Sequence, residues 1–177
     1  PEKKSGELRH ELEVWMGVPG EPAAEMRPRT RLIRVTGHYT AYEVMLDVLD
    51  GVQVYGHLLI PREHAKPLPA IVCQHGLGGQ PKDITGLGEK PDKVYHEFGA
   101  RLAEQGYVVF APYVTVPIPQ PELINPIVRK AAAVGMMRTA IEVRKLRRVV
   151  DFLQSLPYVD GSHIGYYGLS YGGYSAI

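Results

Sequence analysis

The feature that most limits what this chain can fold into is an alternation of strands and helices over its second half. Residues 70–73, 107–111 and 163–168 have the pattern of short strands, and the first two are almost wholly apolar, as strands buried on both faces are. Residues 94–106 and 140–153 carry apolar side chains at helical spacing. Strand–helix–strand–helix–strand is typical of parallel crossovers, so we expect a sheet with helices on both faces.

The first half of the chain adds an antiparallel part to this sheet. Residues 31–35 suggest a strand, and the β-rich runs 42–49 and 52–60 meet at Asp50-Gly51, a pair favoured in hairpin turns. The predicted fold class is α/β, with a mixed, mostly parallel sheet.

Two segments are expected to lie outside the sheet. Residues 1–30 are polar and rich in Gly and Pro after a short amphipathic stretch, and they predict an N-terminal arm with one short helix. Residues 113–121 are too proline-rich for a helix or a strand and predict an exposed loop. The main domain is then expected to span residues 31–177.

Composition argues against several classes of function. The 177 residues are 45% hydrophobic and 22% charged, as in globular domains. A formal charge of +1 gives no strong attraction to nucleic acid, and the apolar runs are too short to span a membrane. Cys73 is the single cysteine, in an apolar strand, and no Cys/His cluster has metal-ligand spacing. We therefore expect no metal, and neither nucleic acid nor membrane as a partner.

The cellular compartment is left open by the sequence. Residues 1–4 do not open a signal peptide, which favours the cytoplasm, whereas a signal removed upstream would favour secretion.

The motif that carries chemistry is Gly168-Leu169-Ser170-Tyr171-Gly172, which fits the G-x-S-x-G pattern of a nucleophile elbow. A strand that turns at once into a helix forces the central serine into a strained conformation and exposes its hydroxyl, while the glycines let the two backbones approach. Ser170 is therefore the candidate nucleophile. The alternative, an ordinary glycine-rich turn, is less favoured because a predicted strand directly precedes the motif.

A second glycine-rich segment, residues 75–79, directly follows the apolar strand 70–73 and Gln74. An oxyanion hole needs two backbone donors that converge on one point. One is the amide of the residue after the nucleophile, here Tyr171, and the other comes from a loop after an earlier strand, here Leu77. We expect these two amides to form the oxyanion hole, with His75 holding the loop. A flexible turn beside a buried histidine is the alternative.

Three regions resemble the dienelactone-hydrolase and acetyl-xylan-esterase-like members of the α/β-hydrolase superfamily. They are residues 163–173, residues 56–61 together with 70–76, and residues 102–112. The resemblance covers roughly residues 40–177. It implies an α/β-hydrolase fold and a serine esterase without metal or organic cofactor. Its substrate would be a small-molecule or carbohydrate ester, attacked by Ser170 with the oxyanion held by the Leu77 and Tyr171 amides.

The order of residues bears on the rest of the catalytic triad. In this fold the acid and the histidine follow the nucleophile, whereas all seven histidines precede Ser170. We therefore expect the acid and the histidine beyond Ile177, in a longer chain of which this is the N-terminal, nucleophile-bearing part. Alone it would be inactive, because an unassisted serine is a weak nucleophile. The nucleophile strand would be an open sheet edge, and this edge and the arm would permit a homo-oligomer.

Two other functions stay open at this point. Residues 168–174 also fit the pattern of prolyl-oligopeptidase-type serine peptidases, which usually carry a large propeller that the short arm does not supply. A non-catalytic protein with the same fold is the second alternative, and covalent labelling by a fluorophosphonate would distinguish it from an enzyme.

Overall fold

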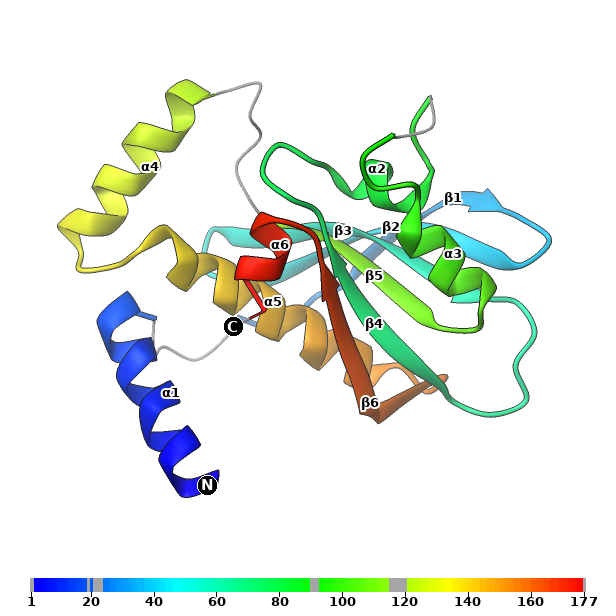
Figure 1. The fold of residues 1–177 in the computed structure, drawn as a ribbon, viewed down its shortest axis with the longest axis horizontal. Coiled ribbons are helices and arrows are strands. Elements are labelled where there is room, and N and C mark those ends of the chain that lie inside the picture. Colours follow the sequence, from blue (N-terminus) through cyan, green and yellow to red (C-terminus); the bar gives the residue numbers. More distant parts are fainter. Residues whose placement is uncertain (1, 19, 21–23, 90–92, 115–120, 177) are drawn as a thin grey trace.

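The structure, a computed structural model, describes residues 2–18, 20, 24–89, 93–114 and 121–176. The described strands form one six-stranded sheet with the order β1-β2-β3-β5-β4-β6 (Figure 1). Three of its pairings are antiparallel and two are parallel. The sheet is mixed and has helices on both faces, as the sequence predicted.

The first half of the chain builds the antiparallel part. β1 (Arg29–Val35), β2 (Tyr39–Leu49) and β3 (Val52–Pro61) follow one another as a meander. Gly51 has a φ of 71°, in the left-handed region where glycine needs no strain. The hairpin turn predicted at Asp50-Gly51 is confirmed.

The parallel part creates the sheet edge at which a site can form. β4 (Leu68–Gln74) lies between β5 (Val108–Tyr113) and β6 (Val159–Gly168) and runs parallel to both. Gln74 pairs with Gly168, the last residues of β4 and β6, so the loops after these two strands leave the sheet at the same level. β6 is an edge strand of the described sheet.

Helices cover the sheet on both sides. α2 (Pro81–Thr85) and α3 (Phe98–Glu104) pack on one face, and α5 (Arg138–Ser155) packs on the other (Figure 1). α5 is the long helix that the sequence predicted, and it ends before Pro157.

The other predicted helix begins later than its pattern suggested. Val94 was expected on its buried face, but it is 62% exposed, and His96 and Glu97 have φ of 49° and 55°. Two successive residues in the left-handed region interrupt a helix, so α3 starts only at Phe98.

The described residues form three further helices. α1 (Glu2–Met16) is a helix of 15 residues that contacts α5, and α6 (Tyr171–Tyr174) follows β6. α4 (Pro121–Ala133) was not predicted. Of the expected exposed loop 113–121, residues 115–120 lie outside the described residues, whereas Val114 is buried, so at that position the expectation of exposure was wrong.

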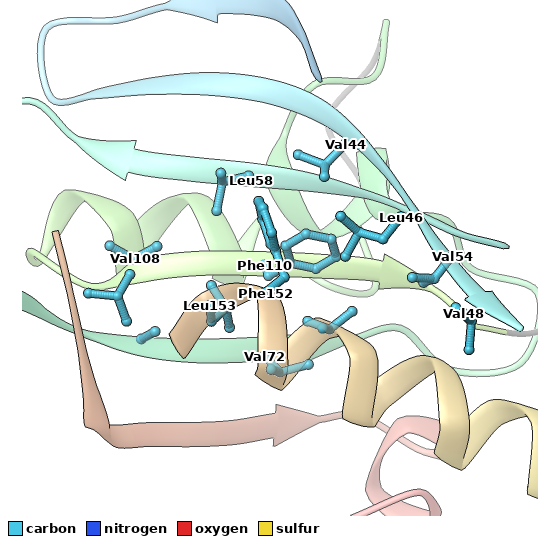
Figure 2. Packing of buried hydrophobic residues seen from close by; sticks show 13 residues of the cluster. Val44, Leu46, Val48, Val54, Leu58, Val72, Val108, Phe110, Phe152 and Leu153 are labelled. Atoms are coloured by element: carbon cyan, nitrogen blue, oxygen red, sulfur yellow. The ribbon is translucent and has the colours of Figure 1, made fainter. Parts of the chain in front are cut away.

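Two apolar clusters hold the layers together. The cluster between the sheet and α5 contains Phe110, whose ring lies 6.0 Å from that of Phe152 in an edge-to-face arrangement (Figure 2). The cluster on the opposite face includes Cys73, Ile84 and Val109. Cys73 is fully buried, and burial raises the pKa of its thiol. It is thus a core residue, as its place in an apolar strand predicted.

Candidate active site

Ser170 lies between the end of β6 and the start of α6 (Figure 1). Its backbone has φ 56° and ψ −116°, and L residues avoid positive φ because the Cβ collides with the backbone. The residue is exposed. The residue therefore occupies a strained turn from strand to helix, as expected for the centre of the G-x-S-x-G motif.

The two glycines of the motif are required by close backbone contacts. A Cβ on Gly168 would lie 2.3 Å from the carbonyl oxygen of Gly172. A Cβ on Gly172 would lie 2.5 Å from the carbonyl oxygen of Gln74, at the end of β4. Both distances are shorter than van der Waals contact, so only glycine lets α6 pack this closely against β6 and β4.

The glycine-rich loop after β4 lies directly against Ser170. A Cβ on Gly76 would lie 3.2 Å from both the Cβ of Ser170 and the carbonyl oxygen of Leu169. Leu77 follows in this loop, and Tyr171 is the first residue of α6. The structure thus brings the segments of all three predicted site residues to one edge of the sheet. That the amides of Leu77 and Tyr171 converge on one point stays a prediction.

His75 is fully buried beneath this loop. Its Nδ1 lies 2.7 Å from the carbonyl oxygen of Gly76, and its ring lies 5.5 Å from that of Tyr113. Burial lowers the pKa of the imidazole, which favours the neutral ring. These contacts suit a histidine that holds the loop.

Tyr95 contacts the glycine-rich loop, although the sequence analysis did not single it out. Its hydroxyl accepts a hydrogen bond of 2.9 Å from the amide of Gly76, 19 residues away. A Cβ on Gly79 would lie 2.4 Å from the same hydroxyl, so the phenol fills the space inside the loop. No motif surrounds Tyr95, and only the folded chain brings it to the loop.

Two side chains, of Tyr166 and Ser175, bind backbone carbonyl oxygens of α6, and Gln74 contacts both of them. The hydroxyl of Tyr166 contacts the side-chain oxygen of Gln74 and lies 3.0 Å from the carbonyl oxygen of Gly172. Nε2 of Gln74 donates to Oγ of Ser175 at 3.0 Å, and that hydroxyl donates to the carbonyl oxygen of Tyr171 at 3.1 Å. Burial raises the pKa of Tyr166, so its phenol remains a donor.

Helix α5 binds the side chain of Tyr171. The hydroxyl donates to Oε2 of Glu142 at 2.6 Å and accepts from Nη2 of Arg138 at 2.7 Å. Nε of Arg138 lies 3.2 Å from Oε1 of Glu142, and the guanidinium carbon lies 5.2 Å from the centre of the Tyr171 ring. Burial and the bond to Glu142 raise the pKa of Tyr171 to about 12. Burial also raises the pKa of the Glu142 carboxyl, against the effects of Tyr171 and Arg138.

Within the ranges that the structure describes, no helix is long and apolar enough to cross a membrane. In the same ranges, no group of three or more His, Cys, Asp or Glu side chains is arranged to hold a metal ion.

Comparison with known proteins gives no match in sequence: neither a protein-family model nor a curated protein matches this chain. Solved structures do match. A Bacteroides fragilis protein described as a candidate acetyl xylan esterase has a TM-score of 0.82 at 19% identity, over 99% of this chain and 49% of that one. Acetyl xylan esterase 1 from Thermoanaerobacterium has a TM-score of 0.63 at 14% identity, over 95% and 51%.

A third solved structure is a dienelactone hydrolase-like promiscuous phosphotriesterase from metagenomic libraries. Its TM-score is 0.52 at 21% identity, over 78% of this chain and 52% of that one. This chain has the α/β-hydrolase fold. It spans about half the length of each of these three solved structures.

Proposed function

We propose that this α/β-hydrolase protein is a serine hydrolase of carboxylic esters that forms an acyl-enzyme on Ser170. The observation that carries the proposal is the strained, exposed serine between β6 and α6, packed against the glycine loop after β4. A non-glycine residue keeps a positive φ only where its surroundings fix it, and such residues cluster at active sites.

Ester hydrolysis follows in two steps from this arrangement. Oγ of Ser170 attacks the ester carbonyl carbon while a histidine takes its proton, and the carbonyl oxygen becomes an oxyanion bound by the amides of Leu77 and Tyr171. Collapse expels the alcohol, which receives the proton. Water then attacks the acyl-enzyme in the same way and releases the acid and Ser170. We place the histidine and the triad acid beyond Ile177.

The substrate class is proposed from the structural neighbours. Two of the three structures above are described as acetyl xylan esterases, one of them as a candidate, and the third as a phosphotriesterase. These names favour small or carbohydrate-linked esters as substrates. They favour peptides less, the substrates of the peptidases whose pattern residues 168–174 also fit.

The decisive test is hydrolysis of p-nitrophenyl acetate by the protein in its full length, beside its Ser170→Ala variant. We expect the substitution to lower kcat by at least about 10³-fold and to abolish labelling by a fluorophosphonate. Ser162→Ala is the matched control, because Ser162 is an exposed serine of the same strand that binds Asp160 and His163. An active Ser170→Ala variant would exclude Ser170 as the nucleophile. Absence of labelling in the folded, unmodified protein would favour a non-catalytic role.

A further inference from the structure

The residues after Ser170 depend on contacts from elsewhere in the fold. α6 has four residues, and a helix of one turn has no stability of its own in water. Ser170 also holds a strained conformation, which costs free energy and relaxes unless neighbouring structure prevents it. The side chains that bind α6 therefore decide where the hydroxyl of Ser170 and the amide of Tyr171 lie.

A second set of contacts, from Arg138 and Glu142 of α5, binds the phenol of Tyr171. The phenol, the guanidinium and the carboxylate contact one another pairwise, with distances of 2.6, 2.7 and 3.2 Å. A closed set of three partners restrains the phenol in more than one direction. Since Tyr171 directly follows Ser170, this restraint acts on the peptide unit that joins them.

Helix stability does not account for this arrangement. Arg138 is the first residue of α5, where the helix dipole disfavours a positive charge. Its partner Glu142 follows four residues later, the less favourable order for an ion pair along a helix. Glu142 is also only 4% exposed, and a buried carboxylate seldom stabilises a fold more than apolar side chains of the same size would. The contacts of Arg138 and Glu142 instead orient the phenol of Tyr171, because hydrogen bonds fix an orientation that apolar contacts leave free.

We propose that Arg138 and Glu142 are positioning residues of the active site, which hold Tyr171 so that its amide and the hydroxyl of Ser170 keep their catalytic geometry. This inference rests on the proposed esterase function. Neither residue touches the reacting atoms; both act through Tyr171.

The central variant is Tyr171→Phe, which keeps the ring and removes the hydroxyl. In the full-length protein we expect kcat for p-nitrophenyl acetate to fall on the order of 10- to 100-fold, since small displacements of reacting groups have effects of this size. KM should change less than about twofold, because the loss falls on the transition state. The rate of fluorophosphonate labelling should fall with kcat.

Tyr174→Phe is the matched control. Tyr174 lies in the same short helix, its ring is 5.5 Å from that of Tyr171, and it is 57% exposed. We expect this variant to keep the kcat of the unmodified protein.

Arg138→Lys keeps the charge but not the planar group with several donors, so it should lower kcat as Tyr171→Phe does. Combined with Tyr171→Phe it should add little, because both changes break one network.

The outcomes separate this inference from the proposed function. A Tyr171→Phe variant that is folded by circular dichroism and keeps kcat within twofold would overturn the positioning role. The proposed esterase function would still stand if Ser170→Ala had lost activity. A fall in kcat that only matched a loss of folded protein would also overturn it.

A stability measurement tests the positioning role without activity. Glycine at position 170 should be more stable than alanine, because it relieves the strained φ. If Arg138 and Glu142 hold that strain through Tyr171, the advantage of Ser170→Gly over Ser170→Ala should shrink by at least about half in the Tyr171→Phe background. An undiminished advantage would contradict the inference, even if the protein hydrolysed no ester.

Discussion

Ser170 is held in a backbone conformation that residues other than glycine rarely adopt. Its φ of 56° would suit glycine, yet the proposed chemistry needs a hydroxyl at this position. The strained conformation destabilises the folded state, and contacts from β4, β6 and α5 to α6 offset this effect.

A first prediction concerns this strain. Ser170→Gly and Ser170→Ala both remove the hydroxyl, but only glycine adopts the observed conformation freely. We expect the glycine variant to be more stable than the alanine variant by about 1 kcal/mol, the reverse of the usual order at unstrained positions. Urea unfolding of both variants measures the difference. An alanine variant that is the more stable of the two would show that the turn is relaxed in solution.

At the scale of the elements, α6 packs closely against the ends of the parallel strands β4 and β6. Gly172 faces the carbonyl oxygens of Gln74 and His75, whereas the neighbouring Gly173 faces only Gly168 at ordinary contact distance. Two adjacent glycines of one short helix therefore face different constraints.

This contrast gives a second prediction. Gly172→Ala would place a Cβ 2.5 Å from the carbonyl oxygen of Gln74, and we expect it to destabilise the protein by about 2 kcal/mol or more. Gly173→Ala would place its Cβ 3.6 Å from the carbonyl oxygen of Gly168, and we expect a change of less than about 1 kcal/mol, because alanine favours helix. Thermal unfolding of the two variants, side by side, measures both effects. Equal destabilisation would mean that α6 does not pack on β4 as described.

At the scale of the whole molecule, Asp47 of β2 binds side chains from β1, from β3 and from the segment before β1. Its carboxylate accepts hydrogen bonds from Arg27 before β1, Arg29 in β1 and Gln53 in β3, at 2.7, 2.6 and 2.9 Å. The hydrogen bond from Arg29 is the largest of the effects that lower the pKa of Asp47 to about 2, with Gln53 and Arg27 also contributing.

The lowered pKa predicts how stability depends on pH. A carboxyl group whose pKa is lower in the folded than in the unfolded chain stabilises the fold above its unfolded pKa, near pH 4, and loses this contribution as the pH falls through the folded value of about 2. Asp47→Asn should therefore be less stable than the unmodified protein at pH 7, and the difference should close between about pH 4 and pH 2. Urea unfolding at several pH values checks this, and a difference that stays constant with pH would contradict it.

Much of this fold follows from local patterns in the sequence. The hairpin at Asp50-Gly51 and the buried strands β4 and β5 were predictable because backbone preferences and runs of apolar residues are properties of adjacent residues. The strained turn at Ser170 belongs with them, since Gly168 and Gly172 permit a conformation that few other residues would allow.

Other features were decided only by tertiary structure. α3 begins at Phe98 because residues 96 and 97 adopt left-handed conformations that the spacing of apolar side chains does not reveal. Tyr95 binds the loop of Gly76, and Arg138 with Glu142 binds Tyr171, across 19 to 33 residues of sequence. A local pattern can state that a tyrosine or a carboxylate is present. Which partner it meets depends on how the sheet and α5 pack, because hydrogen bonds form between groups that the whole fold brings within about 3 Å.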